Sequence, residues 1–187
     1  MDLKKALTYV AVGFLFTLVN LNITLNGTTI NVTPDFIGWI LFFFAYDKLG
    51  SYMEDKIYMK WLALVLAIIS AATWLLQLTK PEFDISILTT IVSAVSMVYL
   101  FILLKTLEKV AKDYGSNTQS TILILKYINV FLNIAFIVVA LLAANNLENS
   151  ALIMATGMIG AMALMAAVFT CLSLFRLRKD VNAKIID

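Results

Sequence analysis

The chain has 187 residues, of which 61% are hydrophobic and 14% are charged, and its mean hydropathy is +0.92. Soluble domains are nearer half apolar and a quarter charged, so this composition indicates a chain that is solvated by lipid. The net charge of +2 is too small to indicate a nucleic-acid partner, and the absence of histidine removes the commonest ligand of transition metals. With Cys171 as the single cysteine, we expect no metal, no cofactor and no internal disulfide.

The first apolar segment, residues 6–25, follows a short basic stretch and is long enough to cross a bilayer. It mimics a secretory signal, but it is longer than a typical signal core and no Ala-x-Ala site follows it, so we predict a membrane helix. The connection after it contains Asn26-Gly27, a pair that indicates a turn.

The second segment, residues 34–52, is less apolar but begins with residues that favour a helix start. Thr33 suits the N-cap, Pro34 the first helical position, and the Asp35 carboxylate the positive end of the helix dipole. At 1.5 Å per residue the helix is roughly 28 Å long, which is enough to span if Lys48 reaches back to the interface. The alternative is a re-entrant segment that enters and leaves on the outer side.

Four further apolar segments predict spanning helices. The fourth of the six helices is expected to continue into the headgroup region until Gly115 ends it. Lys126, near the inner end of the next helix, is expected to extend towards the membrane surface. The four segments cover residues 61–78, 85–104, 121–143 and 151–175.

The basic residues decide the topology, because they collect on the cytoplasmic side of membrane proteins. With six spans and a cytoplasmic N-terminus, Lys80 is the single one of the 14 basic residues that falls outside. A re-entrant second segment would move Lys48, Lys56 and Lys60 outside and invert everything downstream. We therefore predict one integral membrane domain over residues 1–187: an all-α bundle of six transmembrane helices in the plasma membrane, with both termini cytoplasmic.

Polar side chains inside predicted spans are the main candidates for a functional site. Hydroxyl groups recur at helical spacing in the third and fourth helices, for example at Ser93 and Ser96. Such groups commonly serve helix packing, but amides and a carboxylate in the outer half also suit a polar pocket that opens outwards and binds a small molecule. The candidate ligand-binding residues are Asn20, Asn22, Asp35 and Gln77, with Asn129 and Asn133 lying deeper.

The last helix is dense in small residues at small-xxx-small spacing, which lets helix backbones approach closely. This face packs either within the bundle or against another membrane protein. Interleaved methionines, such as Met158, make the surface adaptable. The candidate partner surface comprises Ala155, Gly157, Gly160 and Ala161.

No catalytic pattern is found in the sequence: there is no phosphate-binding loop, no nucleophile elbow and no pair of acids on one helix face. We therefore expect that the protein is not an enzyme. An intramembrane enzyme that acts on lipid remains a third class, and it would need an acid or lysine buried beside a groove that lipid can enter.

The stretch INVTPDFIGWILFFFAYDKL, residues 30–49, resembles a motif in a group of small uncharacterised membrane proteins of Gram-positive bacteria. In that group a first span and a short Asn-rich outer turn precede Pro-Asp-Phe-Ile-Gly and a helix. The resemblance covers roughly the first fifty residues. It implies a bacterial membrane protein and brings no functional residues with it.

The predicted architecture is also similar to that of the substrate-binding subunits of energy-coupling-factor vitamin transporters. Those subunits dock on a transmembrane partner through small residues of the first helix, whereas Ala6, Ala11 and Gly13 here do not form the Ala-x-x-x-Ala pattern. The favoured hypothesis is a non-catalytic membrane protein with an accessory, immunity or partner-binding role. The alternative is a solute-binding transporter subunit with an outward-facing polar pocket.

Overall fold

The computed structural model describes residues 2–18, 22–25, 28–31, 34–52, 56–79, 86–144 and 149–186. The described residues form six α-helices, a two-stranded antiparallel hairpin and a short 3-10 turn. The helices are α1 (Leu3–Leu18), α2 (Asp35–Leu49), α3 (Lys56–Thr79), α4 (Ser86–Asp113), α5 (Gln119–Ala144) and α6 (Ser150–Ile186). The strands are β1 (Asn22–Leu25) and β2 (Thr28–Asn31), and the turn is η1 (Gly50–Tyr52).

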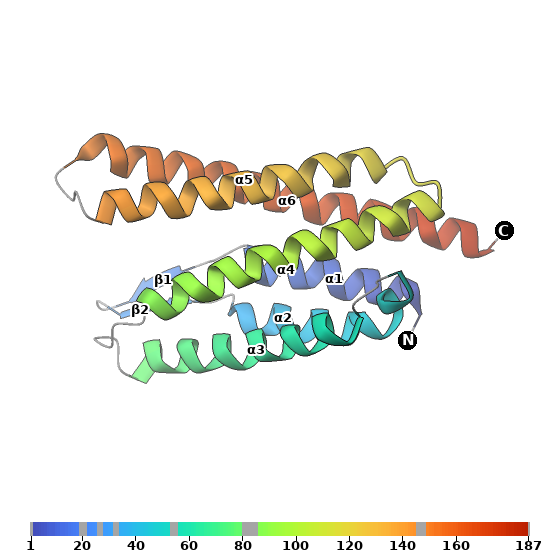
Figure 1. The fold of residues 1–187 in the computed structure, drawn as a ribbon, viewed down its shortest axis with the longest axis horizontal. Helices are drawn as coiled ribbons and strands as arrows, with labels where there is room; N and C mark the ends of the chain where they lie inside the picture. Colours follow the sequence, from blue (N-terminus) through green and yellow to red (C-terminus); the bar gives the residue numbers. More distant parts are fainter. Residues whose placement is uncertain are drawn as a thin grey trace.

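The helices form an elongated bundle in which α4 runs between the α5–α6 pair and the α2–α3 pair (Figure 1). α1 packs against both α2 and α6, and so joins the two sides of the bundle. Both termini lie at one end, together with η1 and the α4–α5 connection, and this is called the terminal end below (Figure 1). The strands lie towards the opposite end, which is called the hairpin end.

Four helices are long and apolar enough to cross a membrane, over Ile57–Leu76, Thr90–Asp113, Gln119–Val139 and Ser150–Lys184. This finding fits the predicted membrane bundle. α1 and α2 have 16 and 15 residues, or roughly 24 and 22 Å, which is less than the hydrocarbon thickness of about 30 Å. The count of six spans and the cytoplasmic termini therefore stay predictions.

The outer part of the predicted first helix is wrong, because α1 ends at Leu18 and Asn22–Leu25 is a strand. Ile23 pairs with Ile30 and Thr24 with Thr29 in an antiparallel register. β-branched residues on both sides of an Asn-Gly pair are a hairpin signal, and this signal overrides the apolar character of the segment. The predicted turn at residues 26–27 lies outside the described residues.

Two predicted helix boundaries are close to those observed. α2 begins at Asp35, and Pro34 takes the cap position with extended backbone rather than the first helical position; Thr33 lies outside the described residues. Gly115 ends α4 as predicted, with φ +53°. Its N–H donates to the Lys112 carbonyl and the Ser116 N–H donates to the Ala111 carbonyl, which is the Schellman arrangement.

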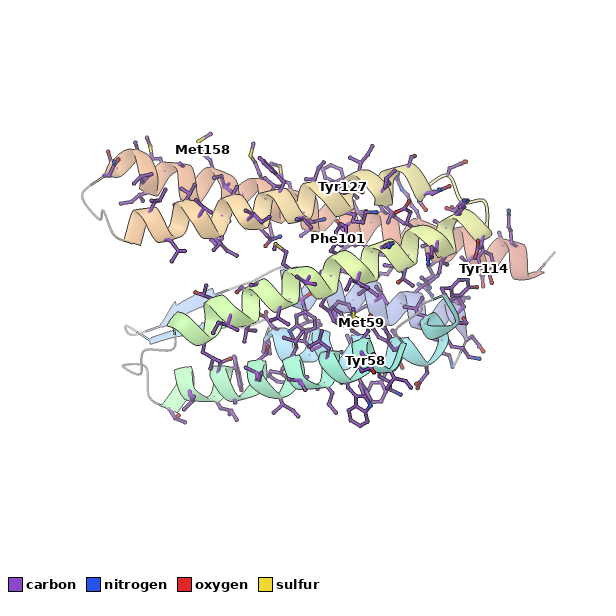
Figure 2. All side chains as sticks on the ribbon, viewed as in Figure 1. Tyr58, Met59, Phe101, Tyr114, Tyr127 and Met158 are labelled. Carbon is purple, nitrogen blue, oxygen red and sulfur yellow. The ribbon has the colours of Figure 1, made fainter. Side chains whose placement is uncertain are left out.

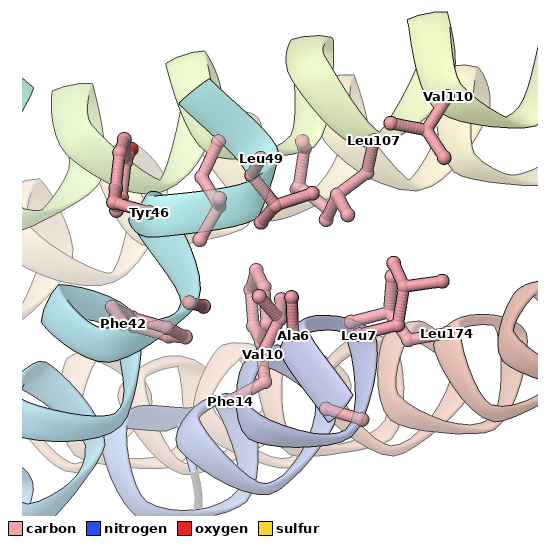
Figure 3. Packing of buried hydrophobic residues seen from close by; sticks show 14 of the residues in the cluster. Ala6, Leu7, Val10, Phe14, Phe42, Tyr46, Leu49, Leu107, Val110 and Leu174 are labelled. Carbon is pink, nitrogen blue, oxygen red and sulfur yellow. The ribbon is translucent and has the colours of Figure 1, made fainter. Parts of the chain in front are cut away.

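Buried side chains concentrate towards the terminal end of the bundle. Residues of α1, α2, α4 and α6 pack against one another there, with Phe14, Phe42, Leu107 and Leu174 among the fully buried ones (Figure 3). In contrast, apolar side chains of the outer helices point away from the bundle, as Tyr58 and Met158 do on opposite sides (Figure 2). Exposed apolar faces of this kind are expected of helices in contact with lipid.

Candidate ligand cavity

A cavity of about 580 Å³ lies between α1, α2, α4, α5 and α6. Its wall is largely apolar and aromatic, with Phe14, Trp39, Phe101 and Phe136 among the lining residues. Polar groups from several helices converge on this wall, although they are far apart in the sequence. They are Thr17, Asp35, Ser93, Ser96, Lys126, Asn129 and Asn133.

Asp35 brings the one carboxylate of this lining. It is the first residue of α2, where the positive end of the helix dipole stabilises a negative charge. Its Oδ1 atom is buried and has no hydrogen-bond partner among the described residues. A buried acceptor without a donor costs free energy, so a molecule that donated a hydrogen bond to this oxygen would be stabilised there.

Asn129 and Asn133 lie one turn apart on α5 and form a hydrogen-bonded ladder. The Asn129 amide nitrogen donates to the Leu125 carbonyl at 2.8 Å and to the Thr170 hydroxyl of α6 at 2.9 Å. The Asn133 amide nitrogen donates to the Asn129 carbonyl at 2.7 Å. Asn129 therefore joins α5 to α6, and both asparagines line the cavity, while their binding of a ligand stays a prediction.

Lys126 forms an ion pair between two span-capable helices, which the sequence did not reveal. Its Nζ lies 2.7 Å from Glu108 Oε2 of α4, and the two side chains are 5% and 22% exposed. The ammonium also faces the rings of Phe101 and Tyr127, at 5.4 and 4.8 Å from their centroids. The Lys126 charge is thus compensated by Glu108, and its extension towards the membrane surface stays a prediction.

The structure brings three of the six candidate residues to one cavity: Asp35, Asn129 and Asn133. Asn20 lies outside the described residues. Asn22 is in β1 and Gln77 in α3, and their side chains are outside the described part.

The cavity is also lined by residues that were not among the predicted ligand-binding residues: Trp39, Ser93, Ser96 and Lys126. The helical spacing of Ser93 and Ser96 was the available signal for the two serines. Trp39 and Lys126 could not be recognised in this way, because aromatic residues and lysines near span ends are common in membrane proteins and do not by themselves indicate a site.

The predicted partner surface on α6 is divided between two sides of the helix. Gly160 faces α5, since a Cβ atom placed on it would lie 3.4 Å from the Phe136 ring, and it lines the cavity. Gly157 faces outwards with no atom within 4 Å of such a Cβ, and Ala161 is exposed as well. Packing within the bundle thus accounts for Gly160, while a partner at Gly157 and Ala161 stays a prediction.

The described residues hold no group of three or more cysteine, aspartate or glutamate side chains that could bind a metal ion. Comparisons with known proteins give no relative: no family model, no curated protein and no solved structure matches the chain.

Proposed function

We propose that this chain is a non-catalytic integral membrane protein of the bacterial plasma membrane that binds a small solute in its central cavity. The observation that supports the proposal is the convergence of Asp35, Asn129 and Asn133 on one cavity. Its volume of about 580 Å³ falls within the range of about 300–1,000 Å³ that is usual for small-molecule sites. An apolar wall with a few polar groups is also the usual composition of such sites.

The hairpin supports access from the outer side of the membrane. A two-stranded sheet has two edges with unpaired N–H and C=O groups, and such edges do not occur in contact with lipid hydrocarbon. The hairpin end therefore lies in water or against protein, and Asp35 follows β2 closely in the chain. The dense packing at the terminal end favours a cavity that is closed on the other side.

The basic residues support the orientation of the bundle. Lysines and arginines of α3, α4 and α6 lie towards the terminal end, where Lys60, Lys112 and Lys184 are found. By the positive-inside rule this end is cytoplasmic, and the cavity then opens to the outside of the cell. A solute-binding subunit of a transporter is the role that this arrangement favours.

The test is solute binding by the purified protein in detergent, with a matched pair of variants on α6. Ala163→Leu places a larger side chain into the cavity wall, whereas Ala161→Leu adds the same atoms on the exposed side. We expect small polar or amphipathic solutes to raise the unfolding temperature of the wild type and of Ala161→Leu, and to leave Ala163→Leu unchanged. A solute that protects all three proteins equally, or a wild type that no solute protects, would contradict the proposal.

A second candidate function is partner binding through α6, and the open space over Gly157 favours it. Gly157 and Ala161 are one turn apart and exposed, so the helix of another membrane protein can approach this face closely. Gly157→Leu would then lower the amount of complex captured by cross-linking in intact membranes. An unchanged cross-linking pattern would leave solute binding as the single candidate.

A further inference from the structure

We propose that the solute is an organic ammonium ion that carries an apolar body. This inference rests on the proposed function, because it names the chemistry of a ligand for the same cavity. It follows from which polar atoms of the wall are already used by the protein and which are left.

The protein itself uses several hydrogen-bond donors of the polar wall. Both N–H groups of the Asn129 side-chain amide donate hydrogen bonds, one to the Leu125 carbonyl and one to the Thr170 hydroxyl. One N–H group of the Asn133 side-chain amide donates to the Asn129 carbonyl, and the Thr17 hydroxyl donates to the Gly13 carbonyl at 3.1 Å. These four N–H and O–H groups therefore already have acceptors within the protein.

One buried acceptor of the same wall is left without a donor. Asp35 Oδ1 has no partner among the described residues, and none of their hydrogen bonds ends on the side-chain oxygens of Asn129 or Asn133. A ligand that satisfies these oxygens must itself donate hydrogen bonds. An ammonium group supplies up to three donors, and its charge strengthens each bond.

The charge balance of the cavity also favours a cation. Lys126 is the one basic residue of the lining, and Glu108 neutralises it at 2.7 Å. The carboxylate of Asp35 is not neutralised in this way by any described residue. Among the described lining residues, the cavity therefore has one acidic group without a basic partner, and a cation would provide that partner.

The size and the aromatic wall favour an organic cation over a metal ion. A volume of about 580 Å³ far exceeds the roughly 30 Å³ that one water molecule occupies in the liquid. The rings of Phe14, Trp39, Phe101 and Phe136 offer contact area for an apolar body. A bare ion would leave this apolar surface in contact with water.

The experiment compares ammonium probes with neutral molecules of the same shape. Wild-type protein in detergent micelles at pH 8 is titrated with phenethylammonium and, separately, with 2-phenylethanol, and binding is measured by calorimetry. The same titrations are made with Asp35→Asn and with Asp113→Asn, which removes an equal charge from an exposed position at the end of α4. Ala163→Leu reports whether a probe occupies the cavity at all.

We expect phenethylammonium to bind the wild type and Asp113→Asn at least about tenfold more tightly than it binds Asp35→Asn, because a charged hydrogen bond is lost. 2-Phenylethanol should bind more weakly and should not distinguish these variants. Suppose that both probes bind the wild type and Asp35→Asn equally well and that Ala163→Leu binds neither. This result would overturn the ammonium proposal and leave solute binding intact. If neither probe binds the wild type, both proposals are overturned. If sodium chloride stabilises the wild type but not Asp35→Asn, the ligand is a metal ion and not an organic cation.

Discussion

Gly13 of α1 and Gly38 of α2 face each other where the two helices cross. A Cβ atom placed on Gly38 would lie 2.6 Å from the Gly13 carbonyl oxygen, and one placed on Gly13 would lie 3.1 Å from the Gly38 carbonyl oxygen. The first distance leaves no room for a methyl group beside backbone, and the second is tighter than most Cβ contacts. The two short helices are therefore held at a separation that only glycine permits.

Gly38→Ala should lower the free energy of unfolding by about 1–3 kcal/mol, the usual cost of overpacking. The measurement is unfolding by a denaturing detergent, followed by circular dichroism. Gly157→Ala is the control, because its Cβ meets nothing within 4 Å and alanine favours the helix. Equal stability of the two variants would mean that α1 and α2 do not approach as closely as described.

The hydrogen bond from Asn129 to Thr170 should contribute to the pairing of α5 with α6. Thr170→Val removes the acceptor and keeps the shape, so we expect a loss of roughly 0.6–2 kcal/mol in the same unfolding measurement. Thr156→Val on the same helix is the matched control, since the Thr156 hydroxyl bonds only to the Leu152 carbonyl of its own helix. A loss of the same size in both variants would assign the effect to α6 alone.

Replacing one member of the ion pair between Lys126 and Glu108 should strongly lower the free energy of unfolding. Lys126→Met leaves a largely buried carboxylate without its partner, and we expect a loss of about 3 kcal/mol or more in unfolding free energy. The double variant Lys126→Met/Glu108→Leu should recover most of that loss, because both charges are then removed.

Lys60→Met provides the comparison for this ion pair. Lys60 pairs with Asp47 at 2.6 Å, but their side chains are 28% and 55% exposed, so its replacement should cost at most about 1 kcal/mol. A double variant at positions 108 and 126 that is no more stable than Lys126→Met would contradict the ion-pair account.

Substitution of Gly115 should lower the stability of the protein because of the backbone conformation at this position. Its φ of +53° is a left-handed conformation that costs other residues about 1–2 kcal/mol, and a Cβ would lie 2.9 Å from Lys184 Nζ. Gly115→Ala should therefore unfold more easily than the wild type and show faster amide exchange at Ser116. Gly115→Asn should be milder, because asparagine tolerates this conformation better. Indistinguishable alanine and asparagine variants would exclude backbone strain as the cause.

Much of the helical framework follows from sequence patterns, because long apolar segments and capping residues act locally. Gly115 and the Pro34-Asp35 pair are examples in which one or two residues fix a helix boundary to within a position. The hairpin escaped prediction because Asn22–Leu25 is apolar enough to extend a helix pattern. Its strand character depends on pairing with Thr28–Asn31, and a helical pattern does not contain that information.

The cavity was predictable only in part. Asp35, Asn129 and Asn133 stand out as polar groups within apolar helices, so their residue types alone nominate them. Whether they share a space depends on how α2 and α5 sit around α4, which no local pattern determines. The same holds for Glu108 and Lys126, since their 2.7 Å contact depends on the geometry of the α4–α5 connection.

The uneven distribution of the buried core has a consequence for motion. Because α5 and α6 are anchored mainly near the terminal end, where Lys126 and Leu174 are buried, their far ends are attached to the rest of the bundle by few buried side chains. Local opening free energies scale with such buried contacts, so amide exchange along α5 should quicken steadily from Ile122 towards Leu141. Under the proposed function, a solute would enter and leave by fraying of one end of this helix pair, at rates that do not depend on the unfolding of the whole protein.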